Sequence, residues 1–215
     1  MKISILCTDT IHPIVNSLHK WIDEILSKEH SASLFFDKSE LPGGDILFLI
    51  SCHQIIDDSI RNKYSKTLVL HASDLPRGRG WSPHVWAILD GANEITVSMF
   101  EAQNSIDSGA IWLKEKFNLE GHELLSEINS KLFEAELSLM TQAVEQFFKI
   151  IPFKQVGEPG EYMKKRNPAD SRIDPYKSIY EQFNLLRVAD SDRNPSFFDY
   201  CGFRYLIKIE KVDNE

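Results

Sequence analysis

Short apolar runs alternate with amphipathic segments through the first third of the chain. The segment 2–7 is typical of a buried strand, and 14–28 places apolar side chains at helical spacing. A Pro-Gly-Gly turn precedes a second apolar run, 45–50, of the kind found in central parallel strands covered on both faces. A short helix over 57–63 and a third apolar run over 67–70 follow. This alternation predicts a Rossmann-like α/β sheet, in which ligands gather at the carboxyl ends of the strands.

Two more strands and a long helix are expected in the middle of the chain. The strands, 95–100 and 110–117, flank the polar segment 101–109. From 122 to 148, apolar residues recur at helical spacing over a long amphipathic stretch. We expect this helix to close a first domain that spans residues 1–150.

The composition changes after residue 150. Pro, Gly, Lys, Arg and Asp dominate up to about residue 174, which indicates a linker or a substrate-facing loop. A helix over 178–188 and a hairpin around Cys201 and Gly202 are expected to follow. The predicted fold class is therefore α/β, with a Rossmann-like parallel-sheet domain followed by a small C-terminal α+β subdomain with a hairpin. This second region, 151–215, is expected to serve substrate binding or dimerisation, which allows a homodimer.

The overall charge argues against a nucleic-acid partner. The 215 residues carry a formal net charge of -8 at pH 7, and hydrophobic residues make up 42% of them. A protein that tracks phosphates along a polymer needs an excess of Lys and Arg on one face. A local basic cluster such as Lys164-Lys165-Arg166 can still bind a small anionic ligand.

The cysteines and the N-terminal residues bear on the compartment. Cys7, Cys52 and Cys201 are far apart and lack the CxxC spacing, so neither a disulfide framework nor a metal site is predicted. The apolar run after Met1 is too short for a signal peptide or a membrane span. We therefore expect a soluble, cytoplasmic protein with no membrane partner.

Residues 71–91 carry the most specific motif in the chain, HASDLPRGRGWSPHVWAILDG. It resembles the signature His-x-Ser-x-Leu-Pro-x-x-Arg-Gly-x-x-Pro-x-x-Trp of the folate-dependent formyltransferases. In that family an Asp-x-Gly turn follows, and Asp107-Ser108-Gly109 stands here 36 residues after His71. The resemblance continues more loosely into 165–174 and 182–188. It implies a formyltransferase domain that uses 10-formyltetrahydrofolate, without a metal.

The resemblance makes His71 and Asp107 the catalytic pair, and elementary chemistry agrees with it. An amine that attacks a formyl carbonyl generates an oxyanion, so the site needs a hydrogen-bond donor for that oxygen and a route for the amine's proton. An imidazole titrates near neutrality, and a nearby carboxylate favours its protonated form and fixes its orientation. Asp107 can instead accept the amine's proton through water, and the sequence leaves both roles open.

The chain departs from the family two residues before His71. The usual motif is Asn-x-His, in which the Asn hydrogen-bonds the formyl oxygen, whereas this chain has Val69. Valine offers no donor. Ser73, Asn104 and a backbone N–H are the candidates to replace it.

The loops around the motif supply the remaining candidates. The family wraps the folate with the motif loop and with the segment after the preceding strand. The cofactor-binding candidates are Ser51, Cys52, His53, Arg77, Gly78, Arg79, Gly80 and Glu101, and the substrate-binding candidates are Lys165, Arg166, Arg172 and Asn184. Simpler interpretations stay open, since Gly and Pro punctuate ordinary loops and basic clusters are often solvated surface. His53 and His84 are secondary candidates, and Trp81 and Trp86 are expected to pack rather than to stack on a ligand.

The acceptor amine is the least specified part of the reaction. The Gly-Arg-Gly-Trp-Ser-Pro wording of the loop is similar to formyltransferases of pseudaminic-acid pathways, which implies a nucleotide-linked amino sugar, UDP-linked, of the kind used in surface polysaccharide biosynthesis. Methionyl-tRNA is the second acceptor, although those enzymes carry a longer, basic C-terminal domain. Glycinamide ribonucleotide formyltransferase fits the loop and the region after 150 less well. Two rival functions stay open, a formyltetrahydrofolate hydrolase and an inactive folate-binding module, and Val69 is the residue that supports the inactive module.

Overall fold

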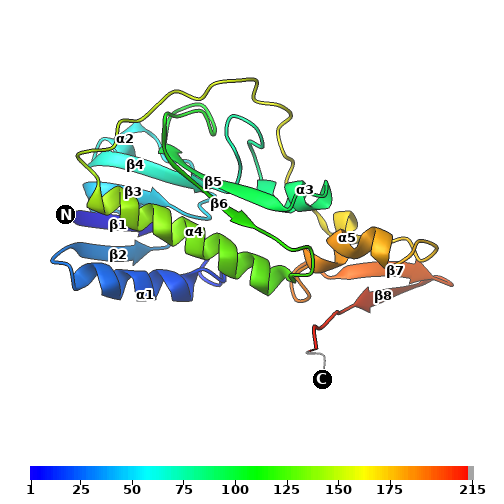
Figure 1. The fold of residues 1–215 in the computed structure, drawn as a ribbon. Coiled ribbons are helices and arrows are strands. Elements are labelled where there is room, and N and C mark those ends of the chain that lie inside the picture. Colours follow the sequence, from blue (N-terminus) through cyan, green and yellow to red (C-terminus); the bar gives the residue numbers. More distant parts are fainter. Residues whose placement is uncertain (213–215) are drawn as a thin grey trace.

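A six-stranded sheet forms the centre of the protein. The computed structural model describes residues 1–212. The strand order is β2-β1-β3-β4-β5-β6 (Figure 1). β5 alone runs against the other five strands, because it pairs antiparallel with both β4 and β6. The strands are β1 (Lys2–Leu6), β2 (Ser31–Phe35), β3 (Gly44–Leu49), β4 (Tyr64–His71), β5 (Glu94–Glu101) and β6 (Ile111–Asn118).

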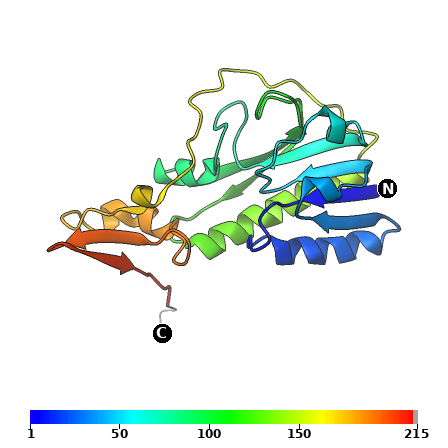
Figure 2. The ribbon, with the colours of Figure 1, turned by 180° about the vertical axis from the view of Figure 1, so that it is seen from behind.

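Helices and loops divide between the two faces of this sheet. Helices α1 (Val15–Leu26) and α4 (Leu125–Glu145) lie together on one face, where their apolar stripes pack on side chains of β1, β3, β4 and β5. The short helices α2 (Asp58–Arg61) and α3 (Pro83–Leu89) and the long loops lie on the other side (Figures 1 and 2). The loop-covered face therefore holds the residues that follow the strands.

The predicted elements of the first domain are present with bounds that differ by a few residues, and one strand and one α-helix were not predicted. The expected helices 57–63 and 122–148 correspond to α2 and α4. β2 was missed because its sequence, Ser-Ala-Ser-Leu-Phe, is short and half polar, as suits the exposed edge of the sheet. α3 was missed within the motif, although Pro83 stands at its first turn, where proline is favoured.

The C-terminal region contains the predicted hairpin but not the predicted helix. β7 (Ser196–Tyr200) and β8 (Phe203–Ile207) pair antiparallel and project from one end of the molecule (Figure 1). In place of a helix over 178–188 there is a 3-10 turn, Tyr180–Gln182, followed by the short α5 (Phe183–Arg187). The side-chain amide of Gln182 donates to the backbone carbonyls of Asp174, Lys177 and Ser178, and these bonds hold a tight turn where the helix was expected to begin.

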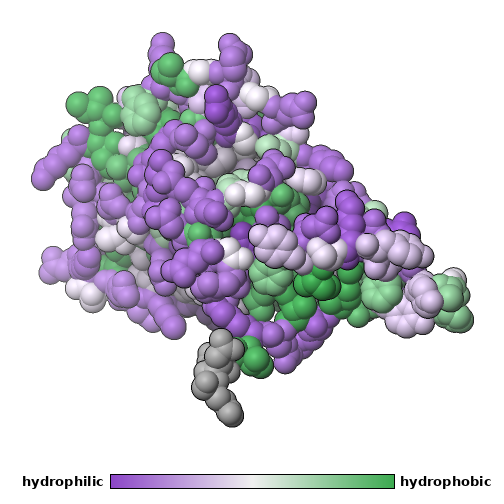
Figure 3. Space-filling view, turned by 45° about the vertical axis from the view of Figure 1, so that its right-hand side comes forward, coloured by the Kyte–Doolittle hydropathy of each residue, from purple (hydrophilic) through white to green (hydrophobic). Residues whose placement is uncertain are grey.

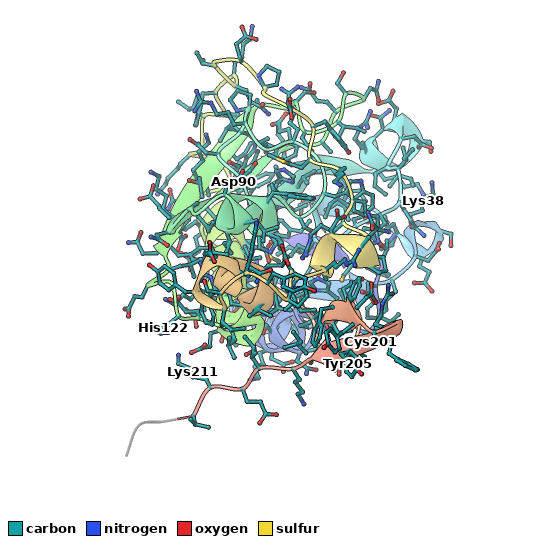
Figure 4. All side chains as sticks on the ribbon, turned by 90° about the vertical axis from the view of Figure 1, so that its right-hand side faces the viewer. Lys38, Asp90, His122, Cys201, Tyr205 and Lys211 are labelled. Carbon is teal, nitrogen blue, oxygen red and sulfur yellow. The ribbon has the colours of Figure 1, made fainter. Side chains whose placement is uncertain are left out.

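The C-terminal region contacts the first domain at several points. Leu186 and Val188 are buried, and Val188 joins an apolar cluster with residues of α3, β5 and α4. Near the end of the chain, Lys211 Nζ contacts His122 Nδ1 at 2.9 Å just before α4, and Figure 4 shows the two residues on the same side of this end. The division at residue 150, and a role of 151–215 in substrate binding or dimerisation, stay predictions.

Two surface properties complete the description. Phe203, Tyr205 and Leu206 are exposed on β8, and Figure 3 shows apolar surface at the hairpin end of the molecule. Within residues 1–212, no helix combines the length and the apolar character needed to cross a membrane.

Candidate active site

His71 is the last residue of β4 and lies at the carboxyl edge of the sheet. Its ring is buried and packs edge-on against Phe100 of the neighbouring β5, with the ring centroids 6.3 Å apart. His71 Nε2 lies 2.8 Å from the carbonyl oxygen of Gly78. A carbonyl only accepts hydrogen bonds, so Nε2 carries a proton and donates it to this oxygen. The strand and the motif loop together therefore fix the ring and its protonated nitrogen.

Asp107 approaches the same nitrogen from the loop between β5 and β6. Asp107 Oδ2 lies 3.9 Å from His71 Nε2, close enough for charge attraction and too far for a hydrogen bond. The same oxygen accepts a hydrogen bond of 2.9 Å from the backbone N–H of Gly80. The predicted catalytic pair is thus brought together, with its carboxylate held by the backbone of the motif loop.

Close backbone contacts explain two glycines of the motifs. A Cβ on Gly80 would lie 2.3 Å from the carbonyl oxygen of Met163, and one on Gly109 would lie 1.7 Å from that of Glu101. Neither position can hold a side chain without moving the backbone. The residues that carry Asp107 and its N–H donor are therefore packed directly against other main chain.

Val69 has apolar surroundings rather than polar ones. It pairs with Phe100 in the sheet and packs against the buried cluster of Leu75, Phe100 and Ile111. Two residues after His71, the Ser73 hydroxyl oxygen is buried and has no hydrogen-bond partner within residues 1–212. Ser73 thus has a free donor close to His71, as expected of a group that replaces the family Asn.

Asn104, the other side chain suggested for that role, lies elsewhere. It is exposed, and its amide oxygen accepts a hydrogen bond from Arg61 of α2. The structure does not bring Asn104 to His71 in this arrangement. The serine is therefore the better placed of the two candidates, and both roles stay predictions.

His84 of α3 lies close enough to His71 for the two charges to interact. Burial, and to a smaller extent the charges of His71 and His12, lower the pKa of His84 to about 4. His84 Nδ1 is buried without a partner among the described residues. His84 is accordingly neutral at pH 7 and keeps one ring nitrogen free.

The predicted cofactor-binding residues fall into two groups. One group surrounds the site. Ser51 follows β3 with a left-handed φ of 47° and bonds His12 through its hydroxyl, while the ring of the exposed His53 contacts that of Trp81 at a tilt of 46°, with the centroids 4.9 Å apart. Cys52 lies between them, and Arg77, Gly78, Arg79 and Gly80 form the motif loop.

Glu101 forms the second group by itself. Its carboxylate accepts hydrogen bonds from Lys66 and from the indole N–H of Trp112, on the helix-covered side of the sheet. Side chains alternate along a strand, so Glu101 points away from the face on which its neighbour Phe100 meets His71. The structure therefore separates the Glu101 side chain from the catalytic pair.

The predicted substrate-binding residues are mostly engaged with the chain itself. Arg166 donates to the carbonyl oxygen of Asp170 and to the Ser171 hydroxyl, and burial lowers its pKa. Arg172 pairs with Asp199 of β7 at 3.3 Å, and the Asn184 amide oxygen accepts from Arg187 Nε at 2.8 Å.

Lys165 is the exception among the four. Its ammonium group lies 4.8 Å from the centroid of the Trp81 ring, and no carboxylate within residues 1–212 forms an ion pair with it. Lys165 thus extends over the same tryptophan that contacts His53.

Sequence reasoning missed Gln155. This residue lies in the segment interpreted as a linker, and its side-chain amide contacts the backbone of Asp107 and of Gly109 and the guanidinium of Arg79. Nothing in the surrounding sequence, Phe-Lys-Gln-Val-Gly, marks a functional position. Only the path of the folded chain brings it to the site.

A cavity of about 500 Å³ lies apart from the catalytic pair. Its walls come from the starts of α1 and α4, the segment after α5 and the end of β8, with Phe133 among the lining residues. Phe133 also contacts His12, at a centroid distance of 5.9 Å. The cavity therefore borders the His12 side of the site but includes neither His71 nor Asp107.

Fold and site together define an α/β protein with a candidate acid–base centre at the carboxyl edge of its sheet. Residues 3–144 match the family described as formyl transferase, and this match covers more than half of the chain. The chain belongs to the formyl transferase family. This identification accords with the resemblance of the His71 motif.

Relatives and solved structures add detail to the family. Methionyl-tRNA formyltransferase of Rickettsia prowazekii is 32% identical over 104 residues, which are 48% of this chain and 34% of that protein. The chain therefore spans about a third of the length of this curated relative.

Three solved structures share the fold. Methionyl-tRNA formyltransferase from Clostridium thermocellum superposes with a TM-score of 0.83 at 22% identity, over 99% of this chain and 94% of that one. HypX from Aquifex aeolicus in complex with tetrahydrofolic acid gives 0.81 at 21% identity, over 96% and 37%. A sugar N-formyltransferase from a Shewanella species gives 0.67 at 16% identity, over 99% of both chains. The predicted Rossmann-like formyltransferase fold is confirmed.

Proposed function

We propose that this protein transfers a formyl group from 10-formyltetrahydrofolate to the amine of a nucleotide-linked amino sugar. The observation that carries the proposal is the pair formed by His71 and Asp107, 3.9 Å apart at the carboxyl edge of a formyl transferase fold. Likeness to HypX, a protein solved with tetrahydrofolic acid, supports the folate donor. The net charge of -8 and the likeness over 99% of both chains to a sugar N-formyltransferase support the acceptor.

Partnerless polar atoms at the site suit a large polar ligand such as the folate. Ser73 Oγ, Arg79 Nε and His84 Nδ1 are buried and have no hydrogen-bond partner within residues 1–212. Buried polar groups are normally hydrogen-bonded, so three such atoms in one motif region point to a bound molecule. We assign contacts with the donor to the motif loop and to the backbone of 51–53, and bound 10-formyltetrahydrofolate supplies the electrophilic formyl carbon.

The chain's own residues then divide the acid–base work. His71 is the donor toward the formyl oxygen, where negative charge develops as the amine attacks, and its Nε2 proton then turns to that oxygen from the carbonyl oxygen of Gly78. Asp107 receives the amine's proton directly or through water, and passes it to the folate nitrogen as the bond between that nitrogen and the formyl carbon breaks. Ser73 supplies the second donor that Val69 lacks.

Methionyl-tRNA is the alternative acceptor, because the curated relatives carry that name. The acidic net charge counts against it, since binding a phosphate polymer requires basic surface. The finer predictions, a UDP-linked acceptor and a pseudaminic-acid type of pathway, rest on the amino-acid sequence of the loop 78–83.

A substrate panel tests the proposal. The full chain is incubated with 10-formyltetrahydrofolate and nucleotide-linked amino sugars that differ in base and in amine position, or with methionyl-tRNA. Tetrahydrofolate release and the acceptor's mass gain are measured together, with His71→Ala as the control. Formylation of one sugar supports the proposal. Formylated methionyl-tRNA, formate release without any acceptor, or donor binding without turnover would each replace it with the corresponding rival function.

A further inference from the structure

The segment 151–165 passes over the loop-covered side of the sheet and reaches both loops of the catalytic pair (Figures 1 and 2). Gln155 lies in this segment. Its amide nitrogen donates to the carbonyl oxygen of Asp107 and to that of Gly109, at 2.9 Å each. Its amide oxygen accepts from Arg79 Nη2 at 3.1 Å. One side chain thus joins the motif loop to the turn that carries Asp107.

Backbone pairing holds Gln155 in place on either side. Phe153, two residues earlier, exchanges two backbone hydrogen bonds with Ile111 at the start of β6, of 2.8 and 2.9 Å. Met163, eight residues later, donates to the carbonyl oxygen of Arg79 and accepts from the N–H of Trp81. The segment is therefore fixed to β6 and to the motif loop, and Gln155 projects from a defined position.

The Asp107 turn has a particular need for such support. Asp107 adopts a φ of 51°, a left-handed conformation that costs energy for residues other than glycine. Its carboxylate is held by the N–H of Gly80. No other hydrogen bond within residues 1–212 reaches the two carbonyl oxygens that Gln155 binds. Gln155 thus holds the backbone of this strained turn, while the Gly80 N–H holds only its carboxylate.

We propose that Gln155 is a positioning residue, which sets the distance of the Asp107 carboxylate from His71. This inference rests on the proposed function, because it assigns to Gln155 an effect on the catalytic step. The two N–H groups of its amide are the active part. Without them the turn relaxes from its left-handed conformation, and the carboxylate leaves its place 3.9 Å from His71 Nε2.

Two substitutions distinguish the role of the N–H donors of the Gln155 amide from the role of its acceptor oxygen. Gln155→Met keeps the length of the side chain and removes every hydrogen bond. Gln155→Glu keeps the acceptor for Arg79 and places a carboxylate against two carbonyl oxygens. Misplacement of a catalytic group by about 1 Å can cost about 100-fold in rate. We expect kcat to fall roughly 10- to 100-fold in Gln155→Met and further in Gln155→Glu, with the KM of either substrate changed less than about threefold.

Gln182 provides a matched control. Its amide donates to the carbonyl oxygens of Asp174, Lys177 and Ser178 and accepts from the N–H of Asp174, so it ties a loop together in the same way. Gln182→Met is expected to lower the melting temperature as Gln155→Met does, while keeping kcat within about twofold of the wild type. Equal losses of kcat in both variants, or a Gln155→Met enzyme with wild-type kcat, would overturn the positioning role.

A readout without turnover separates this inference from the proposed function. Amide hydrogen exchange over residues 103–110 is expected to speed up in Gln155→Met and to stay unchanged in Gln182→Met. A wild-type protein inactive on the whole panel refutes the proposed function. If exchange over 103–110 is also unchanged in Gln155→Met, the tie itself is refuted.

Discussion

The loops around His71 and the basic stretch 164–172 differ in how their polar groups are satisfied. Around His71, the buried atoms Ser73 Oγ and His84 Nδ1 have no hydrogen-bond partner within residues 1–212. In the basic stretch, Lys164 pairs with Asp170 at 3.0 Å and Arg172 with Asp199 at 3.3 Å. A buried polar group without a partner costs about 1 to 3 kcal/mol, which a ligand can recover. Free groups therefore indicate the ligand-binding side, and internally paired groups indicate structural support.

Unpartnered groups also occur away from the loops around His71, and Arg166 and Glu136 are two examples. Arg166 Nε is buried without a partner, although the rest of its guanidinium binds Asp170 and Ser171. Glu136 of α4 is a buried carboxyl with no hydrogen bond or ion pair among the described residues, and burial raises its pKa to about 8. At both positions we expect the unpartnered group to lower the stability of the fold without marking a ligand site. The predictions below test which unpartnered groups bind a ligand and which only destabilise the fold.

The largest effect is expected at the catalytic pair. His71→Ala and Asp107→Ala should each lower kcat by about 100- to 10,000-fold, because each removes a positioned acid–base group. The buried ring of His71 touches Phe100 at its edge, so circular dichroism and melting curves must show that the fold persists. Steady-state transfer in either folded variant at a wild-type kcat would remove the pair from the mechanism.

Glu136 tests whether a buried group without a partner lowers the stability of the fold at a place where no ligand is expected. The folded protein holds its proton up to about pH 8, whereas an unfolded chain releases it near pH 4.5. Below pH 4.5 the raised pKa of Glu136 therefore leaves the free energy of unfolding unchanged. As the pH rises from 4.5 to 8, it lowers the free energy of unfolding by up to about 5 kcal/mol.

The replacement Glu136→Met removes this titration. Its stability relative to the wild type should increase steadily from pH 5 to pH 8, as measured by urea unfolding. Glu134→Met, on the exposed face of the same helix, serves as the control. A gain that does not depend on pH would show that Glu136 has a partner in solution.

The sequence was sufficient for the parts of the molecule that follow local rules. Apolar runs located β1, β3 and β4, and the spacing of the motif located His71 and Asp107, because strands and signature loops are encoded by neighbouring residues. β2 escaped because an exposed edge strand needs few apolar residues. Gln155 and the inward or outward direction of Glu101 depend on contacts between distant segments, and no local pattern contains them.

A moderate effect is expected at Lys165, whose ammonium group lies over Trp81 and has neither an ion pair nor a hydrogen bond within residues 1–212. If the stretch contacts the acceptor's diphosphate, Lys165→Ala should raise the acceptor KM about three- to tenfold and leave the folate Kd unchanged. Arg172→Ala should have a smaller effect, because its guanidinium already pairs with Asp199. Initial-rate kinetics on both variants will order the two positions. If the acceptor KM is unchanged in both variants, the stretch 164–172 is solvated surface and does not contact the acceptor.

The smallest effect is expected at Val69, where the chain departs from its family. The valine side chain has no donor, and it packs with Leu75, Phe100 and Ile111. Val69→Asn would add a donor near the formyl oxygen and raise kcat by roughly fivefold, equivalent to about 1 kcal/mol, if the amide is well aimed. The opposing effect is burial, since an amide without a partner in this apolar cluster costs about 1 to 3 kcal/mol of stability.

Measuring kcat and melting temperature in the same variants separates these two effects, and Ser73 makes the test sharper. The free Ser73 hydroxyl is the best-placed substitute donor, so Ser73→Ala should lower kcat by roughly tenfold or more. Val69→Asn should then restore part of the loss in the double variant, because two donors that serve one oxygen are not additive. If Val69→Asn is stable and its kcat is unchanged in both backgrounds, the formyl oxygen already has its donor elsewhere. The difference between this site and the Asn-containing members of the family would then have no kinetic consequence.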